Sequence, residues 1–345
     1  MFSIVNRMLV VAAMAAALVL MPLSASAQAT PSPAADPVES LQRGVDWLVS
    51  QQGADGAWIG FSGTSDPGVT IDAVIALAAA ANAGIEVDLT SAVQFLAENG
   101  EEYARSGTGQ AAKLVLAAVA VGEDPTTFAG LDSVERMQRD YNAPTNMYGT
   151  GMYDTALVTL ALSTVDKTPP GIVMSAIEDR QMADGSWAFD GTTAAGNGDT
   201  NTTAIVVQAL VAIGETESDQ VLHGIEYLQR TQLAEGFPFQ TAPGAVPDAN
   251  STALVVQALI AAGEDPSAPE WQNAFGAMLA FQTPDGSFSY QLDPLAANLF
   301  ATVQVLPALA SQAFPVESEA TPVALRTVPA CGSAGLAVAD LPCAA

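Results

Sequence analysis

The sequence feature that most constrains the fold is a short turn that recurs along the chain. "QQGADGAW" covers residues 51–58, "QMADGSW" covers 181–187 and "QTPDGSF" covers 282–288, and a weaker copy, "QLAEGF", begins at Gln232. The last three copies are almost evenly spaced, and the gap before them has room for two further, degenerate copies. A regular period of this length is the signature of a repeat architecture.

Each repeat contains two kinds of helical segment. One carries large apolar residues at helical spacing, as at Val221, Ile225 and Leu228, which is typical of a helix with one buried face. The other is almost wholly small or apolar, as in "TAIVVQAL" from residue 203, and such a helix must be buried on every side. We therefore expect an all-α fold in which six helical hairpins form an α6/α6 toroid (α/α barrel) over residues 38–314. An open solenoid is the alternative.

The repeated turn is interpreted as a structural joint between helices. Its Gln can bond free backbone groups at the end of the outer helix, its Asp-Gly pair supplies a turn in which Gly tolerates positive φ, and the following Trp or Phe packs the turn onto a neighbour. A direct contact of some of these side chains with a ligand is the alternative. The residues assigned to the joints are Gln51, Asp55, Trp58, Gln181, Asp184, Trp187, Gln282 and Asp285.

Residues 1–27 have the pattern of a signal peptide. Arg7 precedes an apolar run, and the small residues of "ASA" end at Ala27, where we expect cleavage. The apolar run is short for a membrane span, so we expect a secreted or extracytoplasmic protein with no stable membrane insertion after cleavage. Retention of the segment as an anchor is the alternative.

Two other segments flank the repeats. Residues 28–37 are rich in Pro and Ala and are expected to form a linker, because they contain no large apolar side chains to bury. Residues 315–345 are expected to form a flexible tail. In an exported chain, Cys331 and Cys343 of this tail can pair in a local disulfide.

The charge of the chain excludes one class of partner. The formal net charge is −27, from 37 acidic and 10 basic residues, which opposes binding to phosphate backbones or anionic lipid. We therefore expect no nucleic-acid partner. We expect a monomer that binds a small molecule.

At its repeat turns the chain resembles the terpenoid cyclase and protein prenyltransferase superfamily, whose squalene-cyclase branch carries Gln-x-x-x-Gly-x-Trp repeats on an α/α toroid. In the cyclases of this family that protonate an alkene, Asp-x-Asp-Asp-Thr-Ala opens an inner helix and its middle Asp donates the proton. The matching stretches here are "DTNTTA" from Asp199 and "DANSTA" from Asp248, so Asn201 and Asn250 stand in place of the acid. Because an amide has no proton of useful acidity, the resemblance implies the fold but not this chemistry.

The metal sites and ligands of other members of this superfamily require residues that can also be sought in the sequence. The chain has no Asp-Asp pair for a magnesium motif. The prenyltransferase zinc site needs Asp, Cys and His, but His223 is the single histidine and both cysteines lie in the tail, so no metal site is predicted. The segment "NLFATVQVLPAL" from Asn298 is similar to the closing segment of the cobalamin carriers intrinsic factor and transcobalamin, and "DTNTTAIVVQAL" from Asp199 is similar to their inner helices. No cofactor is predicted, but this similarity makes a corrinoid a candidate ligand.

The candidate site lies where the inner helices begin. In a toroid of hairpins these starts gather on one rim of the central cavity, where free N–H groups and helix dipoles favour polar or anionic ligand groups. Ordinary helix capping is the alternative role for these residues. The rim residues proposed to bind a ligand are Asp72, Tyr153, Asp154, Asp199, Asn201, Asp248, Asn250 and Asn298.

Two classes of function stay open at this point. We expect a non-catalytic binding or scaffold protein, with an amphiphilic ligand such as an isoprenoid lipid or a corrinoid above an apolar cavity. The alternative is an enzyme, either a divergent terpenoid cyclase or a glycoside- or polysaccharide-active enzyme. The second of these needs two facing carboxylates, for which Asp72, Asp154, Asp199 and Asp248 are the candidates.

Overall fold

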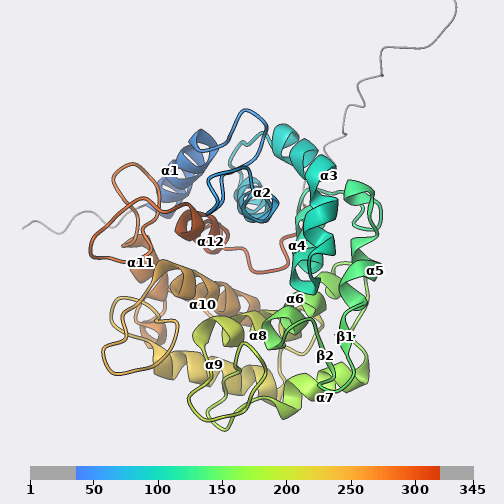
Figure 1. The fold of residues 1–345 in the computed structure, drawn as a ribbon. Helices are drawn as coiled ribbons and strands as arrows, with labels where there is room; N and C mark the ends of the chain where they lie inside the picture. Colours follow the sequence, from blue (N-terminus) through green and yellow to red (C-terminus); the bar gives the residue numbers. More distant parts are fainter. Residues whose placement is uncertain (1–35, 319–345) are drawn as a thin grey trace, which may run out of the picture. The chain divides into compact units, whose positions relative to one another are not determined.

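The inner helices form a closed ring in the computed structural model, which describes residues 36–318 (Figure 1). Each inner helix packs against the next, and the last packs against the first. The α/α toroid is therefore closed rather than an open solenoid. The inner helices are α2 (Pro67–Asn82), α4 (Thr108–Ala120), α6 (Met152–Ser163), α8 (Thr200–Ala212), α10 (Ala249–Ala262) and α12 (Leu299–Leu309).

Helices of more variable length surround this ring. The outer helices are α1 (Pro37–Ser50), α3 (Thr90–Arg105), α5 (Ser133–Gln138), α7 (Gly171–Asp179), α9 (Asp219–Thr231) and α11 (Ala274–Leu279). The short helices α5 and α11 follow the 3-10 turns η1 (Phe128–Gly130) and η2 (Pro269–Trp271). Strands β1 (Tyr141–Asn142) and β2 (Met147–Tyr148) pair antiparallel in the loop before α6. Because α1 packs on α12, the first outer helix lies against the last inner helix, where the ring closes.

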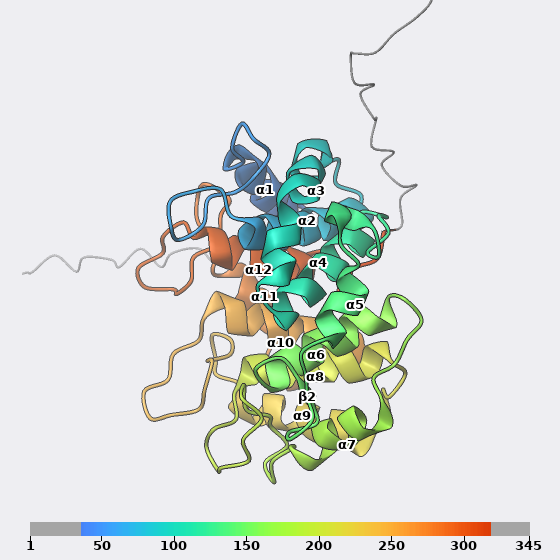
Figure 2. The same cartoon turned by 45° about the vertical axis from the view of Figure 1, so that its right-hand side comes forward.

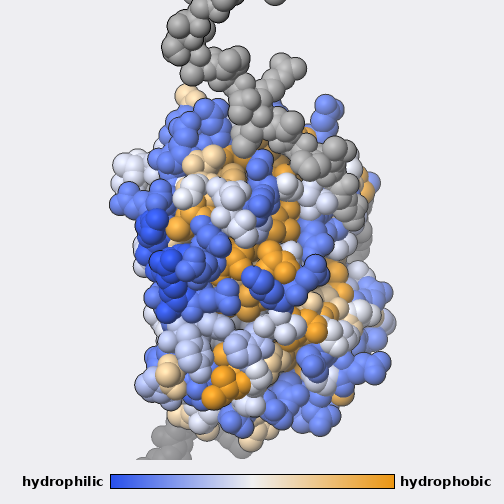
Figure 3. All heavy atoms as spheres, turned by 90° about the vertical axis from the view of Figure 1, so that its right-hand side faces the viewer, coloured by the Kyte–Doolittle hydropathy of each residue, from blue (hydrophilic) through white to orange (hydrophobic). Residues whose placement is uncertain are grey.

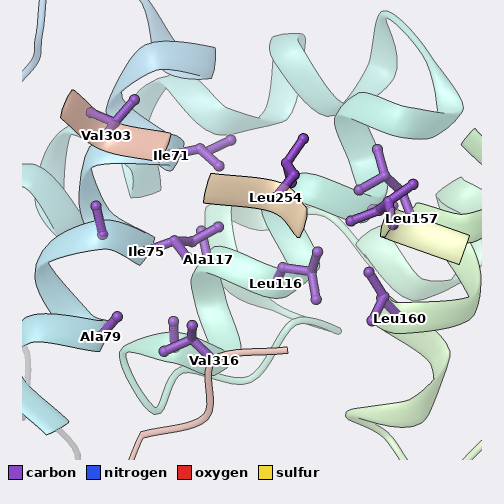
Figure 4. Close-up of a cluster of buried hydrophobic side chains, with 14 of the residues drawn as sticks. Ile71, Ile75, Ala79, Leu116, Ala117, Leu157, Leu160, Leu254, Val303 and Val316 are labelled. Atoms are coloured by element: carbon purple, nitrogen blue, oxygen red, sulfur yellow. The ribbon is translucent and has the colours of Figure 1, made fainter. Parts of the chain in front are cut away.

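The inner helices are buried around their whole circumference, as their composition predicts. Ile205, Val206 and Val207 follow one another in α8 and are each at most 1% exposed, although consecutive helical residues point in different directions. The side chains that point toward the ring axis meet those of other inner helices in one core (Figure 4). On the side of the domain shown in Figure 3, hydrophilic atoms cover much of the surface and hydrophobic atoms show between them.

A threonine at the start of an inner helix fixes each well-formed turn to that helix. The backbone N–H of Trp187 donates to Thr203 Oγ1 at 3.1 Å, and that hydroxyl donates to the carbonyl of Asp199 at 2.7 Å. The Trp187 indole N–H donates to the carbonyl of Ile177 on the preceding outer helix at 2.8 Å. The same threonine bonds occur at Thr70, Thr155, Thr252 and Thr302.

The glutamine of each turn reaches the next outer helix. Gln181 Nε2 donates to the carbonyl of Gly185 in its own turn and to that of Gln220 in α9, at 3.0 and 2.8 Å. Gln282 Nε2 bonds Gly286 and, across the closure of the ring, the carbonyl of Ser40 in α1 at 2.8 Å. One turn therefore joins its own two helices to the following repeat, and the last turn uses the same bond to close the ring.

Two constraints require glycine in the turn, one on its backbone conformation and one on the space around it. Gly185 has φ of +87°, a region that L-residues other than Gly rarely adopt. A Cβ at this position would also collide with the backbone carbonyl of His223 in α9. Gly286 has φ of +98° and meets the carbonyl of Arg43 in the same way, so Gly is required for the approach of the next outer helix.

The assignment of Gln51 to the first joint is corrected by these contacts. Gln52 Nε2 donates to the carbonyl of Gly56 at 2.8 Å and to Ser91 Oγ in α3 at 3.2 Å, which are the bonds of a joint. Gln51 is exposed and contacts only the neighbouring Ser50 hydroxyl. The doubled glutamine allowed either register, and Gln52 has the spacing to Trp58 that Gln181 has to Trp187.

Some of the segments expected from the sequence fall outside the described residues. These are the signal peptide over 1–27, all but the end of the linker, and the pair Cys331 and Cys343. Residues 315–318, which we had placed in the tail, are described, and Val316 among them is 2% exposed. Within residues 36–318 no helix is long and apolar enough to cross a membrane.

We predict that Trp187→Ala destabilises the domain by roughly 3–5 kcal/mol, because it empties a fully buried aromatic site. Urea unfolding monitored by circular dichroism measures this change. An unfolding midpoint equal to that of the wild type would contradict the structural role of the turn.

We predict that Gln52→Ala lowers the free energy of unfolding by about 1 kcal/mol, because two hydrogen bonds between repeats are lost. Gln51→Ala is the matched control and is expected to change stability by less than about 0.5 kcal/mol. Equal effects of the two substitutions would refute the assigned register.

Candidate functional site

Acidic and amide side chains cap the inner helices on the rim from which the long loops project (Figure 2). Asp66 accepts from the N–H groups of Gly68 and Val69 at 2.7 and 3.1 Å, so it is the N-cap of α2. Asn298 caps α12 by accepting from Ala301 N–H at 2.9 Å. Asp154 is not a cap, but it lies in the first turn of α6 and accepts from the N–H and hydroxyl of Thr150, both at 2.8 Å.

Asp199 and Asp248 are the N-caps of α8 and α10, and both carboxylates are buried. Asp199 accepts from the N–H and the hydroxyl of Thr202 at 2.7 and 2.8 Å. Asp248 makes the same two bonds to Ser251, each at 2.8 Å. Burial raises the pKa of both carboxyl groups, and these hydrogen bonds oppose the rise. Both oxygens of each acid are therefore engaged in holding a helix start.

A small cavity lies inside the ring, with a volume of about 100 Å³. Every inner helix contributes to its wall, and the segment after α12 contributes Phe314. Polar groups and apolar side chains both line it. The lining residues are Asp72, Ile75, Lys113, Leu116, Tyr153, Leu157, Ile205, Leu254, Gln304 and Phe314.

An ion pair dominates the electrostatics of this cavity. Lys113 Nζ lies 2.5 Å from Asp72 Oδ1, and their side chains are 27% and 20% exposed. Burial opposes the charge of Lys113, but the Asp72 carboxylate, with Tyr103 and Tyr153, outweighs it and the pKa of Lys113 is raised. Burial, together with Asp72, raises the pKa of Tyr153 to about 12 although Lys113 acts in the opposite direction. Lys113 is thus a cation and Tyr153 a neutral hydroxyl at physiological pH.

Aromatic side chains stand around the rim above the cavity. Tyr153, which lines the cavity, stacks on Phe189 with ring centroids 5.6 Å apart. Phe300 lies one helical turn before Gln304 and stacks on Phe61, which is 90% exposed. The exposed Phe239 and Tyr290 occupy positions in their loops equivalent to that of Phe189.

The inner helices hold these loops by their backbones. The carbonyl of Phe189 accepts from Met152 N–H at 2.9 Å, and those of Phe239 and Tyr290 each accept at 3.0 Å from the first N–H of α8 or α10. The otherwise free N–H groups at the helix starts thereby fix where the aromatic residues stand.

Residues 311–318 form the opposite end of the cavity. Ser311 has φ of +57°, and the N–H groups of Gln312 and Ser311 donate to the carbonyls of Pro307 and Ala308, which is a Schellman stop that turns the chain back from α12. The chain then crosses the centre of the ring (Figure 1). Phe314 N–H donates to Gln208 Oε1 at 2.9 Å, and Val316 belongs to the cluster of buried hydrophobic side chains drawn in Figure 4. We call residues 311–318 the floor segment.

The structure brings together some of the predicted rim residues and separates others. Asp72 and Tyr153 line the cavity, but Asp72 lies inside α2 rather than at its start. Asp199, Asp248 and Asn298 are helix caps, as the capping alternative expected, and Asp154 makes bonds within its own loop. Asn201 and Asn250 are the second residues of α8 and α10. A ligand-binding role for these residues stays a prediction.

Sequence reasoning missed three polar or aromatic residues of the cavity. Lys113 is a charge within an otherwise apolar inner helix, a signal that could have been used. Gln304 lies within the segment from Asn298 whose similarity to the cobalamin carriers is described above. Phe314 had no signal, because it is the last residue of the predicted repeats and follows the last inner helix, where the helical pattern has ended.

A cavity inside the ring is also expected from the sequence, and the structure contains one, but it is small. The floor segment fills part of the ring, so about 100 Å³ remains, below the range of about 300–1,000 Å³ of common ligand pockets. Among residues 36–318, no group of three or more His, Cys, Asp or Glu side chains is placed to hold a metal ion.

Comparison with known proteins finds similar folds without close sequence relatives. No protein-family model matches the sequence, and no curated protein matches it. Among solved structures, the type II terpene cyclase MstE from Scytonema has a TM-score of 0.59 at 14% identity, covering 79% of this chain and 97% of that one. A polysaccharide lyase has a TM-score of 0.57 at 13% identity, with coverage of 81% and 97%.

A third similar structure belongs to another class of enzyme. Cellobiose 2-epimerase from Bacillus thermoamylovorans has a TM-score of 0.57 at 10% identity, covering 79% of this chain and 98% of that one. At these identities the likeness shows the fold alone. The α/α toroid implied by the resemblance to terpenoid cyclases is confirmed, and toroids of this kind include terpene cyclases and carbohydrate-active enzymes.

We predict that stability falls as the pH rises from about 10 to 12, with Tyr153 contributing to the slope. In the folded state the Tyr153 hydroxyl holds its proton up to a pKa of about 12, whereas in the unfolded chain it releases it near the ordinary tyrosine pKa of 10.0, so this stability is present below pH 10 and lost as the pH rises toward 12. Tyr153→Phe should make the decline in unfolding free energy, measured by urea titration across this range, less steep. An unchanged slope would show that Tyr153 is not protected.

Proposed function

We propose that this domain binds a small, neutral amphiphilic molecule without transforming it. The polar head would lie at the level of Lys113, Tyr153 and Gln304, and a short apolar end would extend toward Phe314. The observation that carries the proposal is the cavity itself, whose polar groups lie beside apolar walls from Leu157, Leu254 and their neighbours. Such a combination suits a ligand with both characters.

The ion pair favours a neutral head group. Lys113 and Asp72 are 2.5 Å apart and satisfy each other, so a charged head would pair with one of them only by leaving the other uncompensated. The Tyr153 hydroxyl and the Gln304 amide can donate or accept hydrogen bonds without a charge. A hydroxyl group on a ligand can donate a hydrogen bond to such partners or accept one from them.

An unpartnered acceptor supports a head group that donates hydrogen bonds. Asn250 Oδ1 is buried and has no hydrogen-bond partner, and its residue lies one turn before Leu254, a cavity residue on the same helix. Residues four apart share one face of a helix. Because a buried acceptor without a donor is costly, a hydroxyl on the ligand would satisfy it.

The exposed aromatic residues of the rim support the same proposal. Phe61, Phe189, Phe239 and Tyr290 belong to loops on one rim and leave apolar surface open to solvent. Exposed apolar patches bordered by polar residues often mark binding sites. These rings would cover the part of the ligand that the small cavity cannot enclose.

The four carboxylates considered for catalysis are engaged in other bonds. Asp72 pairs with Lys113, Asp154 with Thr150, and the two buried caps each use both oxygens. An enzyme that cleaves glycosides by acid and base needs two facing carboxyl groups that are free to exchange protons. This engagement favours binding over carbohydrate chemistry and over a divergent cyclase, in which Asn201 and Asn250 would have to act as acids.

Size restricts the candidate ligands. MstE has been solved with geranylgeranyl dihydroxybenzoate, but a cavity of about 100 Å³ encloses only a short group. We therefore place an isoprenoid lipid or a corrinoid, if either is the ligand, mainly on the aromatic rim. Export and a monomeric state, which we expect from the sequence, belong to this proposal.

We predict that 1-hexanol stabilises the mature protein more than hexanoate or hexylamine does. The three probes share a chain and differ in head group, and a tenfold excess over Kd should add about 1.4 kcal/mol to the free energy of unfolding. Thermal melts at matched ionic strength measure the effect. The proposal is abandoned if none of the probes shifts the melt.

A pair of tryptophan substitutions locates the site. Leu254→Trp fills the cavity and should abolish the shift, at a stability cost of about 1–3 kcal/mol for overpacking. Leu222→Trp is the control, since Leu222 is exposed on α9, and it should keep the shift. A shift that survives in Leu254→Trp would place the ligand elsewhere.

A further inference from the structure

The floor segment is held inside the ring by side chains of two inner helices. Gln208 of α8 accepts from Phe314 N–H at 2.9 Å. Gln257 of α10 makes a longer contact, 3.4 Å from its Nε2 to the carbonyl of Gln312. Both glutamines are fully buried, so their amides have little other access to partners, and they fix the backbone on either side of Ala313.

The far end of the segment is also anchored. Val316 is 2% exposed and belongs to the hydrophobic core cluster (Figure 4), and the carbonyl of Glu317 accepts from Asn82 Nδ2 at 2.8 Å at the end of α2. The segment thus runs from α12 past α8 and α10 to α2. It spans the ring at the ends of the inner helices opposite the aromatic rim.

The position of Phe314 between these anchors decides the depth of the cavity. It lines the cavity together with Leu157, Ile205 and Leu254, and its backbone N–H is fixed by Gln208. No other part of the floor segment lines that cavity. The length of ligand that the ring can enclose is therefore set by this side chain.

We infer that Phe314 is the specificity-determining residue of the proposed binding site and limits the buried part of the ligand to a short apolar chain. The inference rests on the proposed function. In a homologous series, each added CH₂ that enters the cavity should raise affinity about fourfold. A CH₂ that meets Phe314 should add nothing, so affinity reaches a plateau at a short chain length.

The test uses linear 1-alkanols from propanol to decanol, with Kd measured by titration calorimetry on the mature protein. For the wild type, affinity is expected to rise with each carbon and then level off. Phe314→Ala should move the plateau to longer chains, with at least a further tenfold gain beyond the wild-type plateau. Phe314→Trp should move the plateau to shorter chains, which provides a second test if the alanine variant does not fold.

Phe189→Ala is the control for this series. It removes an aromatic ring at the rim, so it should weaken all the alkanols by a similar factor and leave the plateau where it is. A wild type without a plateau, or a plateau that stays in place in the folded Phe314 variants, would overturn the inference while leaving the proposed function intact. If no alkanol binds the wild type or any variant, both fail.

Discussion

The hydrogen bonds of one threonine hydroxyl per repeat are the interaction on which the ring depends. At five inner helices, the hydroxyl accepts from the turn that precedes the helix and donates to the first carbonyl of the helix. It therefore satisfies a buried backbone N–H of the turn that no secondary structure pairs, and it adds a second bond to a carbonyl that already accepts the first N–H bond of the helix. With the turn held there, its glutamine reaches the next outer helix and its aromatic residue packs inside the repeat.

Two of the 10 basic residues of the chain serve the same joints. Arg230 of α9 donates to the carbonyl of Asp184 at 2.6 Å, and Arg43 of α1 donates to those of Thr283 and Pro284. The turn of Gln181 and helix α9 are thus bonded twice, because Gln181 donates to α9 and Arg230 of α9 donates to the turn. Gln282 and Arg43 bond their turn to α1 in the same way. These two arginines also bring positive charge and hydrogen-bond donors to the carbonyls of the turns in an acidic protein.

The sequence was sufficient to predict the toroid because its evidence is local and repeated. A turn that recurs at a fixed spacing indicates a repeat architecture. A helix that is apolar on all faces must be buried on every side. The site was less predictable. Asp66 followed by Pro67 indicates an N-cap and a first helical residue. The alignment of the repeats begins at Thr70, however, and it therefore predicts Asp72 rather than Asp66 at the start of the helix. The size of the cavity depends on a segment beyond the repeats, to which no period applies.

The floor segment gives the ring a single open end. In the proposed function, Phe314 of the floor segment covers one end of the cavity and the aromatic side chains of the rim stand at the other. Depth and exchange would then be governed by different parts of the chain: Phe314 would determine how much of an occupant is enclosed, and the loops of Phe189, Phe239 and Tyr290 how quickly it leaves. Because those loops lie outside the joints between helices, residence time can change over evolution without a change in the ring.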